Sequence, residues 1–102
     1  MNMQALLKQA QKMQKELNKA EAELKDHSYE SSMAGGLVRV VVKGSMEVDQ
    51  IEIQEELLNK DEKETLQELL VSAINDAMKQ AADEKNKVMN KMTGGVKLPG
   101  GF

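Results

Sequence analysis

The sequence predicts a small α+β domain with the element order α-β-β-β-α, and three observations support this prediction. Residues 3–24 carry apolar side chains at heptad spacing, residues 37–43 form a β-branched run between glycine-containing turns, and residues 61–92 carry a second helical apolar face. The 102 residues suit one domain, residues 1–102. Because a domain of this size buries only a modest core, we expect it to form a homodimer.

The first helix is predicted over residues 2–26. Its apolar residues are spaced alternately three and four positions apart, which gives a single stripe along a helix: Met3, Leu6, Ala10, Met13, Leu17, Ala20 and Leu24. Four lysines share the opposite face at the same spacing: Lys8, Lys12, Lys15 and Lys19. Two of the seven stripe residues are alanine, so the stripe is thin and the helix needs a packing partner.

Three strands are predicted over residues 28–34, 37–43 and 47–54. Gly35-Gly36 and Gly44-Ser45 fit short turns, so neighbouring strands should run antiparallel as a meander. Alternation places the valines of the central strand on one face. Together with residues of the third strand and the second helix, they form the expected core: Val38, Val40, Val42, Ile51, Ile53, Leu66, Leu70, Ala73 and Ile74.

The second helix is predicted over residues 61–92, with Asp61 and Glu64 as a capping box, Gly94-Gly95 as a stop and residues 94–102 as a flexible tail. A helix of this length spans ~48 Å, whereas the central strand spans ~23 Å. Its second half should therefore project beyond the sheet and lie antiparallel beside the first helix. The two helices would form one projecting arm, on which Lys8, Lys12, Lys85, Lys87 and Lys91 converge.

Charge is unevenly distributed along the chain. The chain holds 14 Lys and Arg against 17 Asp and Glu, a net charge of −3. Residues 1–20, however, hold four lysines and one glutamate, while residues 47–76 hold ten acids and two lysines. Such asymmetry indicates a polyanionic partner at the basic arm. A solvated helix face opposite an apolar stripe would give the same lysine pattern.

Several functional classes are disfavoured. There is no cysteine, and the single histidine, His27, lies in the break between helix and strand, belongs to no nucleophile–base constellation and alone makes no metal site, so we expect no enzyme, catalytic residue, metal, cofactor or small-molecule substrate. The glycine pairs lack the following Lys-Ser/Thr of a phosphate-binding loop. No run of 18 apolar residues is present, so we expect a cytoplasmic protein without a membrane partner.

Four stretches together carry a resemblance to a known family: MQALLKQAQKMQKEL, GGLVRVVVKGS, VSAINDAMKQA and MTGGVKLPGGF. In this order they resemble the YbaB/EbfC family of bacterial nucleoid-associated proteins. The resemblance implies a homodimer whose helical arms bind DNA at the nucleoid. The basic helix positions of the family correspond here to Lys8, Lys12, Lys15, Lys19, Lys79, Lys85, Lys87 and Lys91.

The binding mode can be predicted from residue types. Lysines would neutralise phosphates and release counterions, whereas the one arginine, Arg39, lies on the central strand and neither helix holds an aromatic residue. We therefore expect salt-sensitive duplex binding with little sequence preference, affecting chromosome organisation, gene expression or DNA repair.

Two other functions fit parts of the pattern. A dimeric structural adaptor could bind a protein through the Met/Ala/Leu stripe. Residues 2–25 could lie on a membrane surface, although their apolar face lacks Trp and Phe. Asn75-Asp76, in the middle of the second helix, fits either a local hydrogen bond or a polar contact that fixes the register of the dimer.

Overall fold

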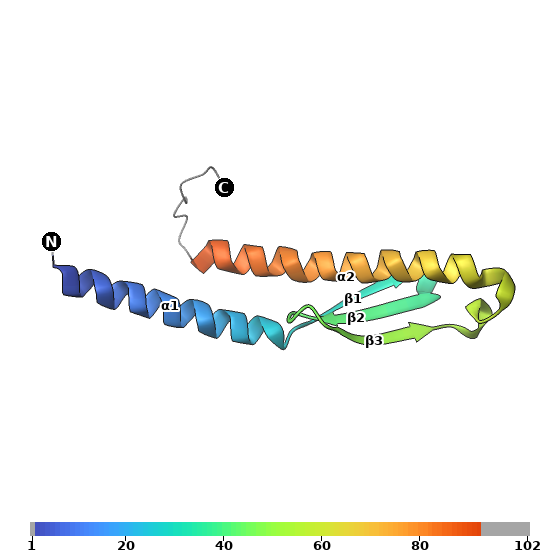
Figure 1. The fold of residues 1–102 in the computed structure, drawn as a ribbon, viewed down its shortest axis with the longest axis horizontal. Helices are drawn as coiled ribbons and strands as arrows, with labels where there is room; N and C mark the ends of the chain where they lie inside the picture. The colour runs from blue at the N-terminus through green and yellow to red at the C-terminus, as the bar shows by residue number, and fades with distance from the viewer. Residues whose placement is uncertain (1, 93–102) are drawn as a thin grey trace.

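The computed structural model describes residues 2–92 and confirms the α+β fold with its α-β-β-β-α order (Figure 1). The sheet order is β1-β2-β3 with both pairs antiparallel, as the predicted meander requires. The molecule is elongated, 70 × 27 × 17 Å. Its helices and strands are α1 (Met3–Lys25), β1 (Ser28–Met33), β2 (Val38–Lys43), β3 (Val48–Ile53) and α2 (Lys63–Met92). The predicted helix stop Gly94-Gly95 and tail 94–102 lie outside the described residues.

Helix α1 is capped at its start by Asn2, whose side-chain oxygen accepts a hydrogen bond from the Gln4 amide at 3.0 Å. This bond satisfies one of the amides that the first helical turn leaves unpaired. Leu24, in the last turn, is the one buried residue of α1. The helix is therefore anchored at its C-terminal end and exposed over most of its length.

The turn between β1 and β2 is longer than the predicted two-residue hairpin turn. Met33 pairs with Val38 across the ladder, and Ala34, Gly35 and Gly36 between them form a 3₁₀ turn. All three have positive φ, from 54° at Ala34 to 95° at Gly36. Glycine adopts this region without a Cβ clash, so the sequence places glycines at two of the three positions.

Helix α2 packs mainly on β1 and β2, and the core lies between them. Val38, Val40 and Val42 are fully buried, as are Ala73 and Ala77 on the helix. The small alanine side chains let the helix backbone lie close to the valines. Leu57, in the 3₁₀ turn Glu55–Leu57, is buried in the same cluster, although the sequence prediction did not include it.

The prediction that Ile51 belongs to the core is wrong. Ile51 pairs with Val40 and therefore shares the α2 side of the sheet, yet it is 44 % exposed. Helix α2 lies mainly over β1 and β2, so the middle of the edge strand β3 is left largely exposed on this side. Ile53, at the end of β3, does pack against the core.

The residue that caps the second helical run is Asn59 rather than Asp61. The Asn59 side chain accepts hydrogen bonds from the Asp61 and Glu62 amides at 3.0 and 3.1 Å. These bonds start a 3₁₀ turn, Lys60–Glu62, which leads directly into α2. The acidic residues Asp61, Glu62 and Glu64 follow the cap, where the positive end of the helix dipole stabilises them.

Candidate nucleic-acid interface

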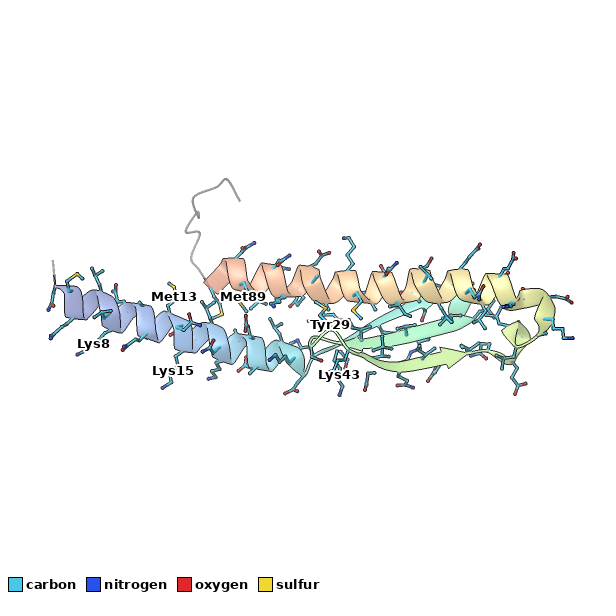
Figure 2. The ribbon with its side chains drawn as sticks, viewed as in Figure 1. Lys8, Met13, Lys15, Tyr29, Lys43 and Met89 are labelled. Carbon is cyan, nitrogen blue, oxygen red and sulfur yellow. The ribbon has the colours of Figure 1, made fainter. Side chains whose placement is uncertain are left out.

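Helix α1 and the second half of α2 lie side by side and antiparallel at one end of the molecule (Figure 1). We call α1 together with residues 81–92 of α2 the arm. At the base of the arm, Leu24 and Ala81 are buried. Farther out, Met13 of α1 and Met89 of α2 point toward each other (Figure 2). The sheet lies beyond the base of the arm, so the arm projects from the body of the domain.

The four lysines of α1 form one exposed row, which we call the lysine row: Lys8, Lys12, Lys15 and Lys19. Figure 2 shows Lys8 and Lys15 pointing away from α2, on the side of α1 opposite to Met13. Among residues 2–92, no acidic side chain forms an ion pair with any of the four. Their ammonium groups are therefore available to an external anion.

The lysines of α2 are exposed as well, but their surroundings differ. Lys79 pairs with Asp83 at 3.0 Å, and its neighbour Gln80 donates a hydrogen bond to the Glu30 carbonyl of β1 at 3.0 Å. Lys79 therefore lies beside the sheet rather than on the arm. Lys85, Lys87 and Lys91 follow on the arm itself, in a stretch from residue 85 to 92 without an acidic residue.

One of the residues that line a small hollow at the base of the arm is a lysine that the sequence prediction did not include among the DNA-binding residues. Lys25 lines this hollow together with Lys85, Glu21, Leu24 and Gly44. Lys25 lies off the lysine row, so the helical spacing does not select it. Its place in the last turn of α1, where the helix dipole favours a cation, is the feature that could have indicated it.

The single arginine lies on the face of the sheet that points away from α2, where two glutamates bind it. Arg39 Nε and Nη2 donate to the two carboxylate oxygens of Glu30 at 2.6 and 3.1 Å, and Nη1 lies 3.2 Å from Glu52. The hydrogen bond from Arg39 lowers the pKa of Glu30, and the same bond raises the pKa of Arg39. Both partners are thus charged at neutral pH, and the guanidinium is engaged in its bidentate geometry.

Other predicted features have local structural roles. Asp76, in the middle of α2, accepts a hydrogen bond from Gln80 at 3.0 Å, which matches the local hydrogen bond expected for the Asn75-Asp76 pair. His27 lies in the α1–β1 connection, where its amide donates to the Leu24 carbonyl. Among residues 2–92, no cluster of three or more His, Cys, Asp or Glu side chains is placed to hold a metal ion.

A cluster of five acidic residues lies at the end of the molecule opposite the arm, while five others lie on the arm itself: Glu16, Glu21, Glu23, Asp83 and Glu84. Glu55, Glu56, Asp61, Glu62 and Glu64 belong to the 3₁₀ turns and to the first turn of α2, at the far end of α2 from the arm (Figure 1). This cluster places part of the negative charge far from the lysine row along the long axis. Neither helix is long and apolar enough to cross a membrane, as far as residues 2–92 show.

Comparison with known proteins identifies the family. The model of the YbaB/EbfC DNA-binding family matches residues 1–96. The chain is similar to a nucleoid-associated protein of Ruminiclostridium cellulolyticum, with 43 % identity over 99 % of this chain and 89 % of that protein. It is equally similar to a nucleoid-associated protein of Alkaliphilus metalliredigens, with the same identity and coverage.

A solved structure shares the fold. The crystal structure of protein HP0035 from Helicobacter pylori superposes with a TM-score of 0.81 and 30 % identity, covering 91 % of this chain and 98 % of that one. The family match covers both helices of the arm and the whole sheet. This chain is therefore a member of the YbaB/EbfC DNA-binding family.

Proposed function

We propose that this chain acts as a homodimer that binds duplex DNA through its lysines, mainly by phosphate contacts and with little sequence preference. The exposed, unpaired lysine row on the arm is the observation that carries the proposal. The proposed contact residues are Lys8, Lys12, Lys15, Lys19, Lys79, Lys85, Lys87 and Lys91. Lys79 contributes least, because Asp83 already neutralises it.

The length of the lysine row suits a duplex. Lys8 and Lys19 are 11 residues apart, which corresponds to ~16 Å along a helix at ~1.5 Å per residue. Duplex DNA carries one phosphate charge per ~1.7 Å of axis, so this length faces roughly ten phosphates. Each of the four lysines can therefore reach a phosphate without a particular base sequence.

Residue types on the arm argue against sequence readout. Arginine makes the bidentate contact to guanine, but the single arginine is engaged by Glu30 and Glu52 on the sheet. Base stacking needs an aromatic side chain, and neither helix contains one. Tyr29 lies on β1 and not on either helix. Its burial raises its pKa, and the nearby Glu84 carboxylate raises it further by a smaller amount.

The uncovered side of β3 supports the dimer. Val48 and Ile51 are 42 % and 44 % exposed, and they pair with Val42 and Val40 on the α2 side of the sheet. An edge strand with exposed apolar side chains is a ready surface for a second chain. A homodimer would cover these residues and double the number of lysines that face the DNA.

The names of the relatives support the proposed cellular role. The similar proteins of two bacterial species are named nucleoid-associated, and the family is a DNA-binding one. We place this chain at the nucleoid in the cytoplasm. There, binding would affect chromosome organisation, gene expression or DNA repair.

The test is a gel shift on a duplex of random sequence, repeated over a range of salt concentrations. Lys8→Glu/Lys12→Glu removes two phosphate contacts per chain, or four per dimer. The slope of log K against log salt should therefore become shallower by roughly 3.6, at ~0.9 per phosphate. The matched control is Lys60→Glu/Lys63→Glu, which makes the same charge change at the acidic end of the molecule.

Sedimentation of both variants separates binding from assembly. We expect both to stay dimeric and only the arm variant to lose affinity. Equal loss in the two variants would show that net charge, rather than the arm, controls binding. Loss of the dimer in the arm variant would assign these lysines to assembly instead, and a wild-type affinity insensitive to salt would contradict the phosphate mechanism.

A further inference from the structure

The outer part of α1 carries exposed apolar side chains. Met13 faces Met89 (Figure 2), and α2 runs only three residues farther, to Met92. The first two turns of α1 therefore extend past the described part of α2. We call Met3, Leu6, Ala10 and Met13 the arm seam. Met3 is 71 % exposed, and Leu6 and Met13 are each 43 % exposed, so the described residues of this chain leave much of the seam open.

The charges around the arm seam favour a second copy of the same helix as its occupant. Leu7 and Gln9 flank the seam between Met3 and Met13, Gln14 follows directly after Met13, and all three are uncharged. The lysine row lies on the opposite side of α1, as Lys8 and Lys15 show in Figure 2. Two such helices can therefore pair seam to seam without placing like charges opposite each other. The 3-4 spacing of the seam is the spacing that paired helices use.

The same arrangement argues against a lipid surface. An anionic membrane would attract lysines at the edges of the buried apolar face. Here Lys8 and Lys15 point away from the seam, so burying the seam in lipid would hold these lysines away from the headgroups. Pairing with another α1 instead leaves the whole lysine row free for DNA.

The seam is small, and this limits when pairing can occur. Four side chains per copy cover far less than the roughly 800 Å² per partner of a standard stable interface. Pairing should therefore be weak between free molecules. It becomes effective when DNA holds several copies at high local concentration.

We propose that the arm seams of neighbouring DNA-bound dimers pair, so that binding along a duplex is cooperative. This inference rests on the proposed DNA-binding function. The variant Leu6→Gln/Met13→Gln removes the seam, and Ala5→Gln, an exposed position off the seam, is its matched control. Binding isotherms are measured on a duplex that accommodates one dimer and on one that accommodates many.

The wild type and Ala5→Gln should give a Hill coefficient clearly above 1 on the long duplex, whereas the seam variant gives about 1. Affinity for the short duplex should stay within about twofold in all three proteins, because the seam makes no DNA contact. A seam variant that remains cooperative would overturn the proposal and leave the seam to another occupant, such as a partner protein. If the seam variant instead loses affinity for the short duplex, the seam acts within a single dimer, and this result also overturns the proposal.

Disulfide cross-linking provides a second readout that does not depend on affinity. The chain has no cysteine, so Leu6→Cys and Ala5→Cys each introduce a unique thiol. We expect Leu6→Cys to form an interchain disulfide on the long duplex and not on the short one, and Ala5→Cys to form none on either. A cross-link on the short duplex would indicate pairing inside one dimer. If the wild type binds neither duplex, the DNA-binding function fails, and cross-linking of concentrated free protein then decides whether the seams pair at all.

Discussion

The position of the arm depends on a glycine in the turn between β2 and β3. A Cβ on Gly44 would lie 2.6 Å from the Leu24 carbonyl carbon and closer still to its oxygen, whereas ordinary contact begins at 3.4 Å. The Gly44 amide also donates to the His27 carbonyl at 2.9 Å. The turn therefore packs directly against the backbone at the C-terminal end of α1, and no side chain fits between them.

Gly44→Ala should both destabilise the domain and tilt the arm. The Leu24 backbone has to move by roughly an ångström, and overpacking of this kind costs about 1–3 kcal/mol. Because α1 extends ~35 Å from this contact, a tilt of about 5° displaces its Met3 end by roughly 3 Å. Urea denaturation followed by circular dichroism measures the stability, and the gel shift reports the effect on the lysine row.

Ser45→Ala is the matched control for this prediction. The Ser45 hydroxyl donates to the Glu47 carboxylate at 2.9 Å in the same exposed turn, and its loss should change the free energy of unfolding by less than about 0.5 kcal/mol. If Gly44→Ala proves as stable as Ser45→Ala and binds DNA equally well, the close packing of turn and helix does not position the arm.

Three further predictions follow from individual contacts. Val40→Ala empties part of the fully buried core and should lower the free energy of unfolding by about 2 kcal/mol in urea denaturation; a loss below half of that would mean that the core collapses onto the space. Arg39 lowers the pKa of Glu30, so the stability that this pair contributes is present at neutral pH and is lost as the pH falls through the lowered pKa. The stability gap between the wild type and Glu30→Gln should thus narrow as the pH falls from neutral through the lowered pKa, and a constant gap would contradict the pairing. Lys79→Gln should weaken duplex binding less than Lys87→Gln in the gel shift, since Lys79 pairs with Asp83 and no ion pair involves Lys87 among residues 2–92; an equal loss would show that this ion pair does not weaken the contact of Lys79 with DNA.

The fold class could be predicted because the apolar period changes from helical to alternating and back along the chain. The valines of β2 illustrate this: alternation alone places Val38, Val40 and Val42 on one face, and all three are buried. Ile51 shows the limit of the method. Its side of the sheet could be predicted from alternation, but its exposure depends on which strands α2 covers, and that is set by packing between distant residues.

The sequence predicted the candidate site to a similar extent: the faces of the helices, but not the contacts between distant segments. Helical spacing places the lysine row on one face of α1, and the length of α2 against the sheet places its second half beside α1. The engagement of Arg39 by Glu30 and Glu52 depends instead on the register of three strands. Lys25 joins Lys85 only through the meeting of α1, α2 and the β2–β3 turn, a contact that spans the length of the chain.

The acidic balance of the chain is compatible with DNA binding because the densest cluster of acids is far from the lysine row. This cluster lies at and just before the start of α2, where it stabilises the helix N-terminus, and the lysine row lies on the arm of a molecule 70 Å long. At physiological salt the Debye length is ~8 Å, so the acidic end adds little to the potential at the arm. A duplex that approaches the arm therefore meets the field of the lysines. The acidic end in turn disfavours binding at the opposite pole, so the charge separation also sets the orientation in which the protein meets DNA.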